Sequence, residues 1–348
     1  MTEYAQALEF CALDPVAAVA AAARIEAAMA ADRIEAGRKE AAHRIGEKAA
    51  TPRVQAEVAA AVAGAARLGE ADSTGTDIKA PRHGSGVADI RAITTTLGDI
   101  WQWPSEGPIK VLAWAGGNLL FVVPQPLSDS DKEMALKAFV AQSKYWGARC
   151  SSIVGPTEFL TPFWQQLAKH WPYAREVRDN QPLLSLSEQP KSNIDPEVNA
   201  SRISELDLIL PANIAMFTEE MGYSPLRFGA HTYRQHVANL INAGHSFRRL
   251  GPPPIPTSGA APPPQQVIFK ADVGQAALGV AQLQGVWIHP DRRGQGLAKP
   301  ALAAAIRQIQ QTIAPTVALY VNHSNRRARH IYADLGFAQV GTFATVLL

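Results

Sequence analysis

The stretch that decides the fold is Val286-Trp287-Ile288-His289-Pro290-Asp291-Arg292-Arg293-Gly294-Gln295-Gly296-Leu297-Ala298. Its first three residues suit a buried strand, because β-branched and aromatic side chains pack well on a pleated sheet. Pro290 ends that strand, since it has no N–H to donate to a neighbouring strand. Gly294 and Gly296 allow the backbone to turn tightly and to approach a ligand closely. The stretch therefore predicts a strand, a glycine-rich loop and the start of a helix.

Apolar residues at helical spacing indicate the helix that follows the loop, namely Ala298, Ala301, Leu302, Ala305, Ile306, Ile309 and Ile313. Pro300 must lie in its first turn, where a missing N–H costs no hydrogen bond. The free N–H groups of that turn point back into the loop, and the helix dipole adds positive potential there. With Arg292 and Arg293 beside it, the loop predicts a binding site for an anion.

The loop sequence narrows the kind of anion. It lacks the Gly-Lys-Ser/Thr ending of a phosphate loop, and Lys299 stands where the dinucleotide fingerprint needs a small residue. The spacing Arg293-x-x-Gly296-x-Ala298 resembles the acetyl-CoA pyrophosphate loop of the GNAT N-acetyltransferases, Arg/Gln-x-x-Gly-x-Gly/Ala. For the loop taken alone, an ordinary glycine turn before a core helix is the alternative.

A second motif lies downstream of the loop. An apolar strand at 317–321 leads to Asn322-His323-Ser324-Asn325 and then to a helix with one apolar face, which Gly336 ends. The pattern Asn325-x-x-Ala328-x-x-x-Tyr332-x-x-x-Gly336-Phe337 resembles the second GNAT motif. The resemblance covers residues 195–348 and implies a GNAT domain of the α/β (α+β) class, a mixed and mostly antiparallel sheet flanked by helices. The whole chain also has a looser likeness to an actinobacterial GNAT group with an uncharacterised N-terminal domain.

The resemblance implies a role for each matching residue. The backbone of the strand would hold the pantetheine arm of acetyl-CoA and the loop N–H groups its pyrophosphate. Asn325 would contact the cofactor or cap its helix. Tyr332 would be the general acid toward the leaving sulfur, with a buried core tyrosine as the alternative. The expected cofactor-binding residues are Val286, Trp287, Ile288, Arg292, Arg293, Gly294, Gln295, Gly296, Leu297, Ala298, Asn325 and Ala328.

The resemblance leaves the general base open. Several GNAT enzymes place a glutamate on the strand before the cofactor loop, but here that strand offers Gln282 and Gln284, which cannot take a proton at neutral pH. The candidates are Glu219, Glu220 and Asp272, or a water chain to one of them. The two glutamates lie on a helix that, in the family, lines the acceptor side, and they would suit a cationic amine. A solvated helix face is the alternative for them.

The chain before residue 195 is predicted to be a degenerate GNAT-like α/β domain over residues 1–190. Its order of hairpin, helix, strand, helix and strand resembles part of the GNAT topology. Gly155-Pro156-Thr157-Glu158 stands at the place expected for a cofactor loop and would cradle phosphate poorly. A second acyl-CoA site there is the alternative.

Four other segments lie outside these motifs. Helices at about 14–38 and 54–68 are weakly amphipathic and are expected on the surface. Residues 39–98 are expected to be a mobile insertion without chemistry. The proline-rich tract 251–266 is expected to be a long hairpin loop.

Composition limits the class of protein. The 348 residues, 47% of them hydrophobic, favour two domains with ample core. A net charge of +2 gives no overall argument for a nucleic-acid or membrane partner. Two cysteines make neither a disulfide framework nor a metal site. No apolar run reaches membrane-spanning length and the start does not resemble a signal peptide, so a cytoplasmic location is expected.

The resemblance implies an acetyl-CoA-dependent N-acetyltransferase in which a primary amine attacks the thioester directly. The acceptor would be a protein amine or a small metabolite, as in a mycothiol synthase-like enzyme. The missing strand glutamate motivates a different alternative, an acyl-CoA-binding sensor without turnover. The last strand, ending at Leu348, is expected either within the sheet or paired with a second subunit, which leaves a homodimer open.

Overall fold

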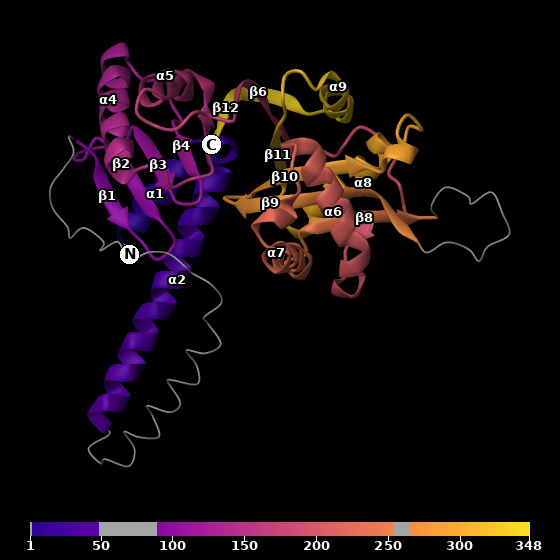
Figure 1. Cartoon of the computed structure of the whole chain (residues 1–348), viewed down its shortest axis with the longest axis horizontal. Helices are drawn as coiled ribbons and strands as arrows, with labels where there is room; N and C mark the ends of the chain where they lie inside the picture. Colours follow the sequence, from indigo (N-terminus) through magenta and orange to yellow (C-terminus); the bar gives the residue numbers. More distant parts are fainter. Residues whose placement is uncertain (1, 49–88, 253–264) are drawn as a thin grey trace.

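The computed structural model describes residues 2–48, 89–252 and 265–348. The strands of these residues form one mixed sheet in the order β1-β2-β3-β4-β5-β12-β6-β11-β10-β9-β8-β7. Figure 1 shows two halves side by side, with β6 and β12 at their junction. The helix expected at 54–68 and residues 253–264 of the proline-rich tract lie outside the described ranges.

The first half contains two N-terminal helices, a run of antiparallel strands and one strand–helix–strand–helix–strand unit. Helix α2 reaches into the range 39–98 and strand β1 lies near its end, so this range is not wholly an irregular insertion. The elements are α1 (Thr2–Cys11), α2 (Pro15–Lys48), β1 (Arg91–Thr94), β2 (Asp99–Trp103), β3 (Val111–Ala115), β4 (Leu119–Val122), α4 (Asp129–Trp146), β5 (Ser152–Pro156), α5 (Thr157–Leu167) and β6 (Glu176–Leu186).

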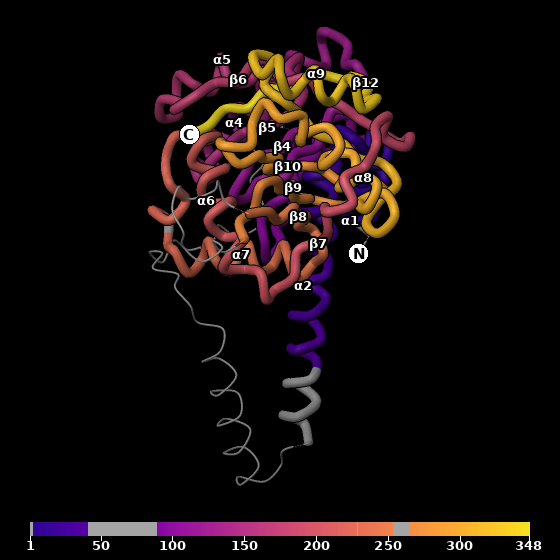
Figure 2. Tube along the Cα trace, turned by 90° about the vertical axis from the view of Figure 1, so that its right-hand side faces the viewer, coloured from indigo at the N-terminus to yellow at the C-terminus, as the bar shows by residue number. Residues whose placement is uncertain are grey.

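The second half begins with a short edge strand and a helix pair and then repeats the same unit. Its elements are β7 (Asn199–Ala200), η1 (Ile203–Glu205), α6 (Leu206–Met221), η2 (Pro225–Phe228), α7 (Ala230–Asn242), β8 (Ser246–Gly251), β9 (Gln266–Ala277), β10 (Val280–Ile288), η3 (Pro290–Arg292), α8 (Ala298–Thr312), β11 (Thr316–Tyr320), α9 (Arg326–Leu335) and β12 (Ala338–Leu347). Figure 2 shows α6 and α7 on one side of strands β8 to β10 and α8 on the other.

The two halves share one order of elements. The hairpin β3–β4 followed by α4, β5, α5 and β6 corresponds to β9–β10 followed by α8, β11, α9 and β12. In both units the second hairpin strand runs parallel to the strand after the helix, β4 to β5 and β10 to β11. Parallel neighbours need a crossover connection, and the helix provides it. The hairpin and helices predicted from the sequence are therefore present in each half.

The last strand of each unit pairs with the other half. Strand β6 lies between β11 and β12, and β12 lies between β5 and β6, and all three of these pairings are antiparallel. Both edges of β12 are therefore paired within the chain. The final strand therefore lies within the sheet. It has no free edge with which to pair with a second subunit.

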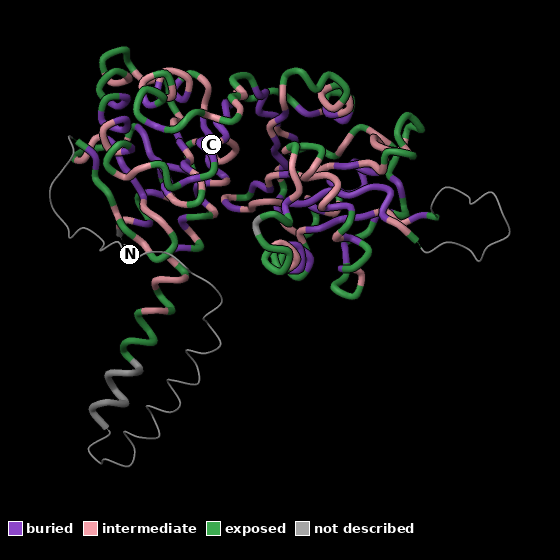
Figure 3. The backbone as a smooth tube through the Cα atoms, in the orientation of Figure 1, coloured by how far each residue is buried: buried purple, intermediate pink, exposed green. Residues whose placement is uncertain are grey.

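Helix α2 differs from the surface helix that was expected at residues 14–38. Its first half is buried, at Ala18, Val19, Ala21, Ala22, Ile25 and Ala28. This face packs on Leu112 and Trp114 in the first half and on Val280 and Ala318 in the second, so α2 braces both. Small alanine side chains let the helix pack closely against the sheet. The weak amphipathic pattern of the sequence does not indicate this burial. Residues 36–40 of α2 extend away from the body and are exposed (Figure 3).

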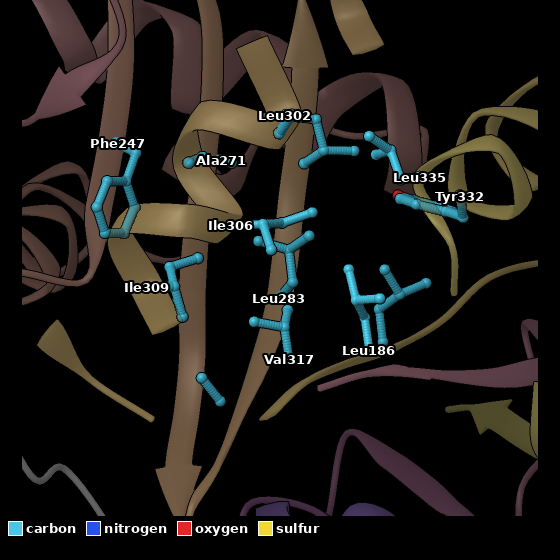
Figure 4. Packing of buried hydrophobic residues seen from close by; sticks show 14 of the residues in the cluster. Leu186, Phe247, Ala271, Leu283, Leu302, Ile306, Ile309, Val317, Tyr332 and Leu335 are labelled. Atoms are coloured by element: carbon cyan, nitrogen blue, oxygen red, sulfur yellow. The ribbon is translucent and has the colours of Figure 1, made fainter. Parts of the chain in front are cut away.

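The apolar face predicted for α8 is confirmed. Leu302, Ile306 and Ile309 are buried and belong to one cluster with Leu283 and Val317 of the sheet (Figure 4). The cluster holds the helix, and with it the glycine loop at its start, against β10 and β11. Of the helices described, none is apolar over a stretch long enough to cross a membrane.

The strand exchange predicts how the protein responds to a cut between its halves. Cleavage at a protease site inserted between Gln189 and Asn193 would break the chain after β6, between the two halves. We expect both fragments to elute together at the position of the uncut 37.4 kDa protein in native buffer, because β6 and β12 each pair with strands of the other fragment. Fragments that separate on a sizing column without denaturant would contradict this pairing.

Candidate active site

A cleft of about 660 Å³ opens where β10 and β11 part. These parallel strands pair only between residues 280–282 and 316–318. Beyond that point β10 lines one wall with Gln284, Gly285 and Val286. Tyr320 at the end of β11 and Asn322 after it line the other wall. Backbone groups that would bond a neighbouring strand are therefore free to bond a ligand.

A bulge in β10 shapes the first wall. Gln284 pairs with Asp272 and Trp287 with Lys270, so Gly285 and Val286 stand together opposite one residue of β9. Gly285 has φ of +60°, a conformation that favours glycine. Such a bulge leaves the extra residue unpaired and redirects the backbone. Both residues of the bulge, Gly285 and Val286, line the cleft.

The glycine loop has the open geometry expected of an anion site. Gly294 and Gly296 have φ of +77° and +75°, and a Cβ on either would meet no atom within 4 Å. The first main-chain bond of α8 in the described residues runs from the Ala301 N–H to the Leu297 carbonyl, at 3.2 Å. The amides before it have no helical acceptor, so the loop and helix start can bind phosphate through N–H groups.

The two arginines of the loop are held by protein groups. Arg293 donates from Nη2 to Glu219 at 2.7 Å and from Nε to the Ile288 carbonyl at 3.0 Å. Arg292 donates from Nη2 to the Pro252 carbonyl at 2.7 Å. Both side chains therefore fix the loop, while its backbone supplies the exposed donors.

Tyr332 is both a core residue and a cleft residue. It is 8% exposed, packs in the α8 cluster and meets Phe337 edge-on at 5.6 Å between ring centroids. It also lines the cleft. Burial, with a smaller contribution from the charge of Glu220, raises the pKa of Tyr332 far above its ordinary value. The phenol is therefore neutral at physiological pH and can donate a proton.

Asn325 caps helix α9, as the sequence indicated. Its side-chain oxygen accepts from the Ala328 N–H at 3.1 Å, and the helix ends at Gly336 with φ of +101°. Asn325 and Ala328 also line the cleft. The cap thus holds the start of α9 where both residues can reach a ligand.

The structure separates the three acidic candidates. Glu219 accepts from the Trp287 indole N–H at 3.1 Å and pairs with Arg293, so it belongs to the loop support rather than to the cleft lining. Glu220 lines the cleft and pairs with Arg178 of β6 at 2.8 Å. Asp272 lines the cleft from β9, is 2% exposed and pairs with the fully buried Lys270.

Sequence reasoning missed several residues of the cleft. Tyr233 and His236 reach it from α7, and their helical spacing with Val237 and Leu240 is a signal that could have indicated a common face. Partial burial lowers the pKa of His236; the positive charge of Lys270 lowers it further and the charge of Asp272 opposes this.

Strand β6 of the first half also contributes to the cleft. Arg178 and Gln181 lie in its wall, and Gln181 donates to the Asn322 side chain at 3.0 Å. No local signal predicts this, because it follows from the strand exchange.

The first half differs at each corresponding position. After β4 its loop carries Pro124 and Pro126 in place of glycines. Gly155 and the residues after it lie instead at the junction of β5 and α5. Phe163 stands as far from the cap of α5 as Tyr332 does from the cap of α9. Phe163 and Phe121 fill the space there, at 4.7 Å between ring centroids. This half therefore lacks the loop and the proton donor.

The residues that the structure describes contain no group of three or more His, Cys, Asp or Glu placed to hold a metal ion. Both cysteines are free and buried.

Comparison with known families assigns the two halves differently. Residues 98–209 match a domain of unknown function (DUF4081), and residues 263–337 match the acetyltransferase (GNAT) family. No curated protein matches the chain. The fold and cleft define a mixed α/β protein with an opened pair of parallel strands. The chain carries a GNAT acetyltransferase domain, preceded by the DUF4081 domain, and the resemblance drawn from the two motifs is confirmed.

Several solved structures are similar to the chain at low identity. A GNAT-family acetyltransferase from Colwellia psychrerythraea is 13% identical with a TM-score of 0.42, over 72% of this chain and 85% of that chain. A GNAT-type N-acetyltransferase from Kribbella flavida is 15% identical with a TM-score of 0.42, over 74% and 89%. A tandem GNAT protein from the clavulanic acid biosynthesis pathway is 10% identical with a TM-score of 0.39, over 71% and 82%.

The loop geometry predicts a clean binding defect. We expect Gly296→Glu to weaken acetyl-CoA binding by about tenfold or more, because a carboxylate enters an anion site and the positive φ is strained. Isothermal titration calorimetry measures the affinity. Gly107→Glu is the matched control, since Gly107 has φ of +84° and equally open surroundings far from the loop. An equal loss in both variants would contradict the assignment of the loop.

Proposed function

We propose that the protein transfers an acetyl group from acetyl-CoA to a primary amine by direct attack on the thioester. The observation that carries the proposal is the opened strand pair, whose bulged wall at Gly285 faces the same cleft as the neutral Tyr332. The family match supports acetyl-CoA as donor, because GNAT proteins use it. The first half serves in this proposal as a companion domain without its own acyl-CoA site, over about residues 1–190, with the transferase domain over 195–348.

The residues of the cleft suit each part of the donor. The loop from Gly294 to Ala298 would hold the pyrophosphate through its N–H groups. The unpaired edge of β10 from Val286 to Ile288 would hold the pantetheine amides as a neighbouring strand would. When bound, acetyl-CoA supplies an activated acetyl group. The bulge N–H groups near Gly285 would stabilise the carbonyl oxygen as negative charge develops there.

Tyr332 has a defined task in this reaction. As the amine nitrogen forms its bond to the carbonyl carbon, the bond from carbon to sulfur breaks and leaves a thiolate. The raised pKa of Tyr332 keeps its proton on the phenol until the sulfur takes it. Burial in the α8 cluster holds the ring in place, so its core packing and its catalytic role do not conflict.

One observation favours a small-molecule acceptor, as in a mycothiol synthase-like enzyme. The cleft is walled by both halves, since Arg178 and Gln181 of β6 face it together with residues of α6 and α7. A site enclosed from two sides suits a compact amine better than a folded protein surface.

A sensor without turnover is the second candidate function. It is favoured by Gln282 and Gln284, which line the cleft from β10 without a titratable group. A sensor needs no proton donor, whereas the enzyme does. Replacement of Tyr332 therefore discriminates between the two functions.

Replacement of Tyr332 by phenylalanine tests the enzyme. We expect Tyr332→Phe to lower kcat by about 10²-fold or more, the usual contribution of a positioned acid, with acetyl-CoA affinity unchanged. Release of free CoA thiol with a panel of alkylamines measures kcat, and calorimetry measures affinity. Tyr145→Phe, on the exposed face of α4, is the control. Unchanged turnover in Tyr332→Phe would exclude the role, and absence of turnover in the unaltered protein would favour the sensor.

A further inference from the structure

One buried oxygen in the cleft has no partner. The Asp272 side chain is 3% exposed, and its Oδ2 accepts from Lys270. Its Oδ1 is buried without a hydrogen-bond partner among the described residues. An unpaired buried acceptor is destabilising, so such groups are rare unless a bound molecule, water included, donates to them. Because Asp272 lines the cleft, the free oxygen indicates a ligand that donates hydrogen bonds.

Asp272 lies directly against the bulge of β10. A Cβ built on Gly285 would stand 3.3 Å from Asp272 Oδ2, 3.0 Å from Lys270 Nζ and 3.1 Å from Met216 Cε. In the proposed function, the thioester carbonyl of acetyl-CoA binds at the backbone of this bulge. A group bonded to Asp272 therefore stands next to the reacting carbon.

Lys270 gives this position its second property. Its side chain is 0% exposed, and its ammonium holds one carboxylate oxygen in place and leaves the other free. A second cation beside it is disfavoured in its charged form, since like charges at short range lower the pKa of an ammonium group. An amine held at Asp272 is therefore bound as a cation, and the Lys270 charge offsets part of the rise in ammonium pKa that the carboxylate causes.

The same cleft contains the side chain of His236, an imidazole that can receive a proton from the amine. It lines the cleft from α7 and remains in contact with solvent, while the charged groups that face it are Asp272 and Lys270 of β9 and Arg24 of α2. The neighbouring Tyr233 donates its own hydroxyl to the Asn213 carbonyl at 3.1 Å and is occupied. Because the pKa of His236 is lowered, its imidazole is neutral near pH 7 and can accept a proton.

We infer that Asp272 binds the ammonium group of a primary alkylamine acceptor and that His236 takes one proton from it. The free amine then attacks the carbonyl carbon, forming the carbon–nitrogen bond as the carbon–sulfur bond breaks. The sulfur takes the Tyr332 proton, and the second proton lost by nitrogen restores Tyr332 through solvent. The products are the acetamide, the CoA thiol and one proton that His236 returns to water. This inference rests on the proposed function.

The position also sets the chemical class of the acceptor. Only a slender head group reaches a carboxylate that is 3% exposed, which favours a primary ammonium on an unbranched carbon chain. Arylamines are neutral near pH 7 and offer no cation, and quaternary ammonium ions have no proton to donate. Both are expected to be poor ligands.

The test uses n-butylamine as probe on the full chain. Asp272→Asn alone leaves Lys270 buried without its partner, so the double variant Lys270→Gln/Asp272→Asn keeps a neutral hydrogen-bonded pair. We expect this double variant to raise KM for n-butylamine about tenfold or more, while its acetyl-CoA affinity stays unchanged. Asp207→Asn is the matched control. The Asp207 side chain, on α6, is 82% exposed and pairs with Arg234 of α7.

His236→Gln supplies a separate readout. We expect kcat/KM of the unaltered protein to fall only at a pH below the ordinary range of imidazole, because the pKa of His236 is lowered and its protonated form cannot accept a proton. We expect His236→Gln to lower kcat/KM by about 10²-fold and to abolish this acidic limb. An unchanged limb would overturn the role of His236.

A binding measurement separates this inference from the proposed function. The NMR signal of the His236 imidazole should shift when n-butylammonium is added to the acetyl-CoA-bound protein, and should not shift in the double variant. Equal shifts in both proteins, or acetylation of aniline as fast as n-butylamine, would overturn the inference. Binding that the double variant abolishes, without any acetyl transfer, would support the amine site and overturn the proposed function.

Discussion

Main-chain pairing across the two halves is the constraint on which the rest of this structure depends. Strand β6 lies against β11 and β12 lies against β5, so each half completes the sheet of the other. A row of antiparallel hydrogen bonds cannot be broken singly without leaving unpaired donors and acceptors in the sheet centre. The position of β11, and therefore the gap between β11 and β10, depends on a strand from the first half.

This dependence gives the first half a reason to be retained without an active site of its own. Its loop after β4 has prolines where the second half has glycines, and Phe163 takes the place of Tyr332. The aromatic cluster around Phe121 fills the corresponding space with apolar contacts, which stabilises the fold. This half supplies β6 to the cleft, with Arg178 against Glu220 and Gln181 against Asn322, and it also supplies Ser152 and Val154 of β5. A repeat that has lost the features of a site can thus still be part of its neighbour's site.

Much of the second half could be predicted because its signals are local. The turn at Gly294 and Gly296, the cap at Asn325 and the stop at Gly336 each depend on a few consecutive residues. The structure of the first half was harder to predict. The burial of α2 was predicted wrongly, because alanine gives a weak periodic signal whether it is buried or exposed. The acids could not be ranked either. Strand alternation left the face of Asp272 undecided, and two adjacent glutamates on one helix proved to point to different partners, Arg293 and Arg178.

The sequence by itself determined the strand, loop and helix around residues 286–298, the capped helix that carries Tyr332, and hence the family, because these follow from backbone dihedrals, caps and apolar spacing within single elements. Only the tertiary structure decided which residues share the cleft. Gln181 and Asn322 are 141 positions apart and meet because β6 crosses to the other half. Asp272 lies at the bulge because β10 pairs Gln284 with Asp272 and Trp287 with Lys270, which leaves one extra residue of β10 between these two pairs. Pairing over such separations is set by the whole sheet, so no segment read alone contains it.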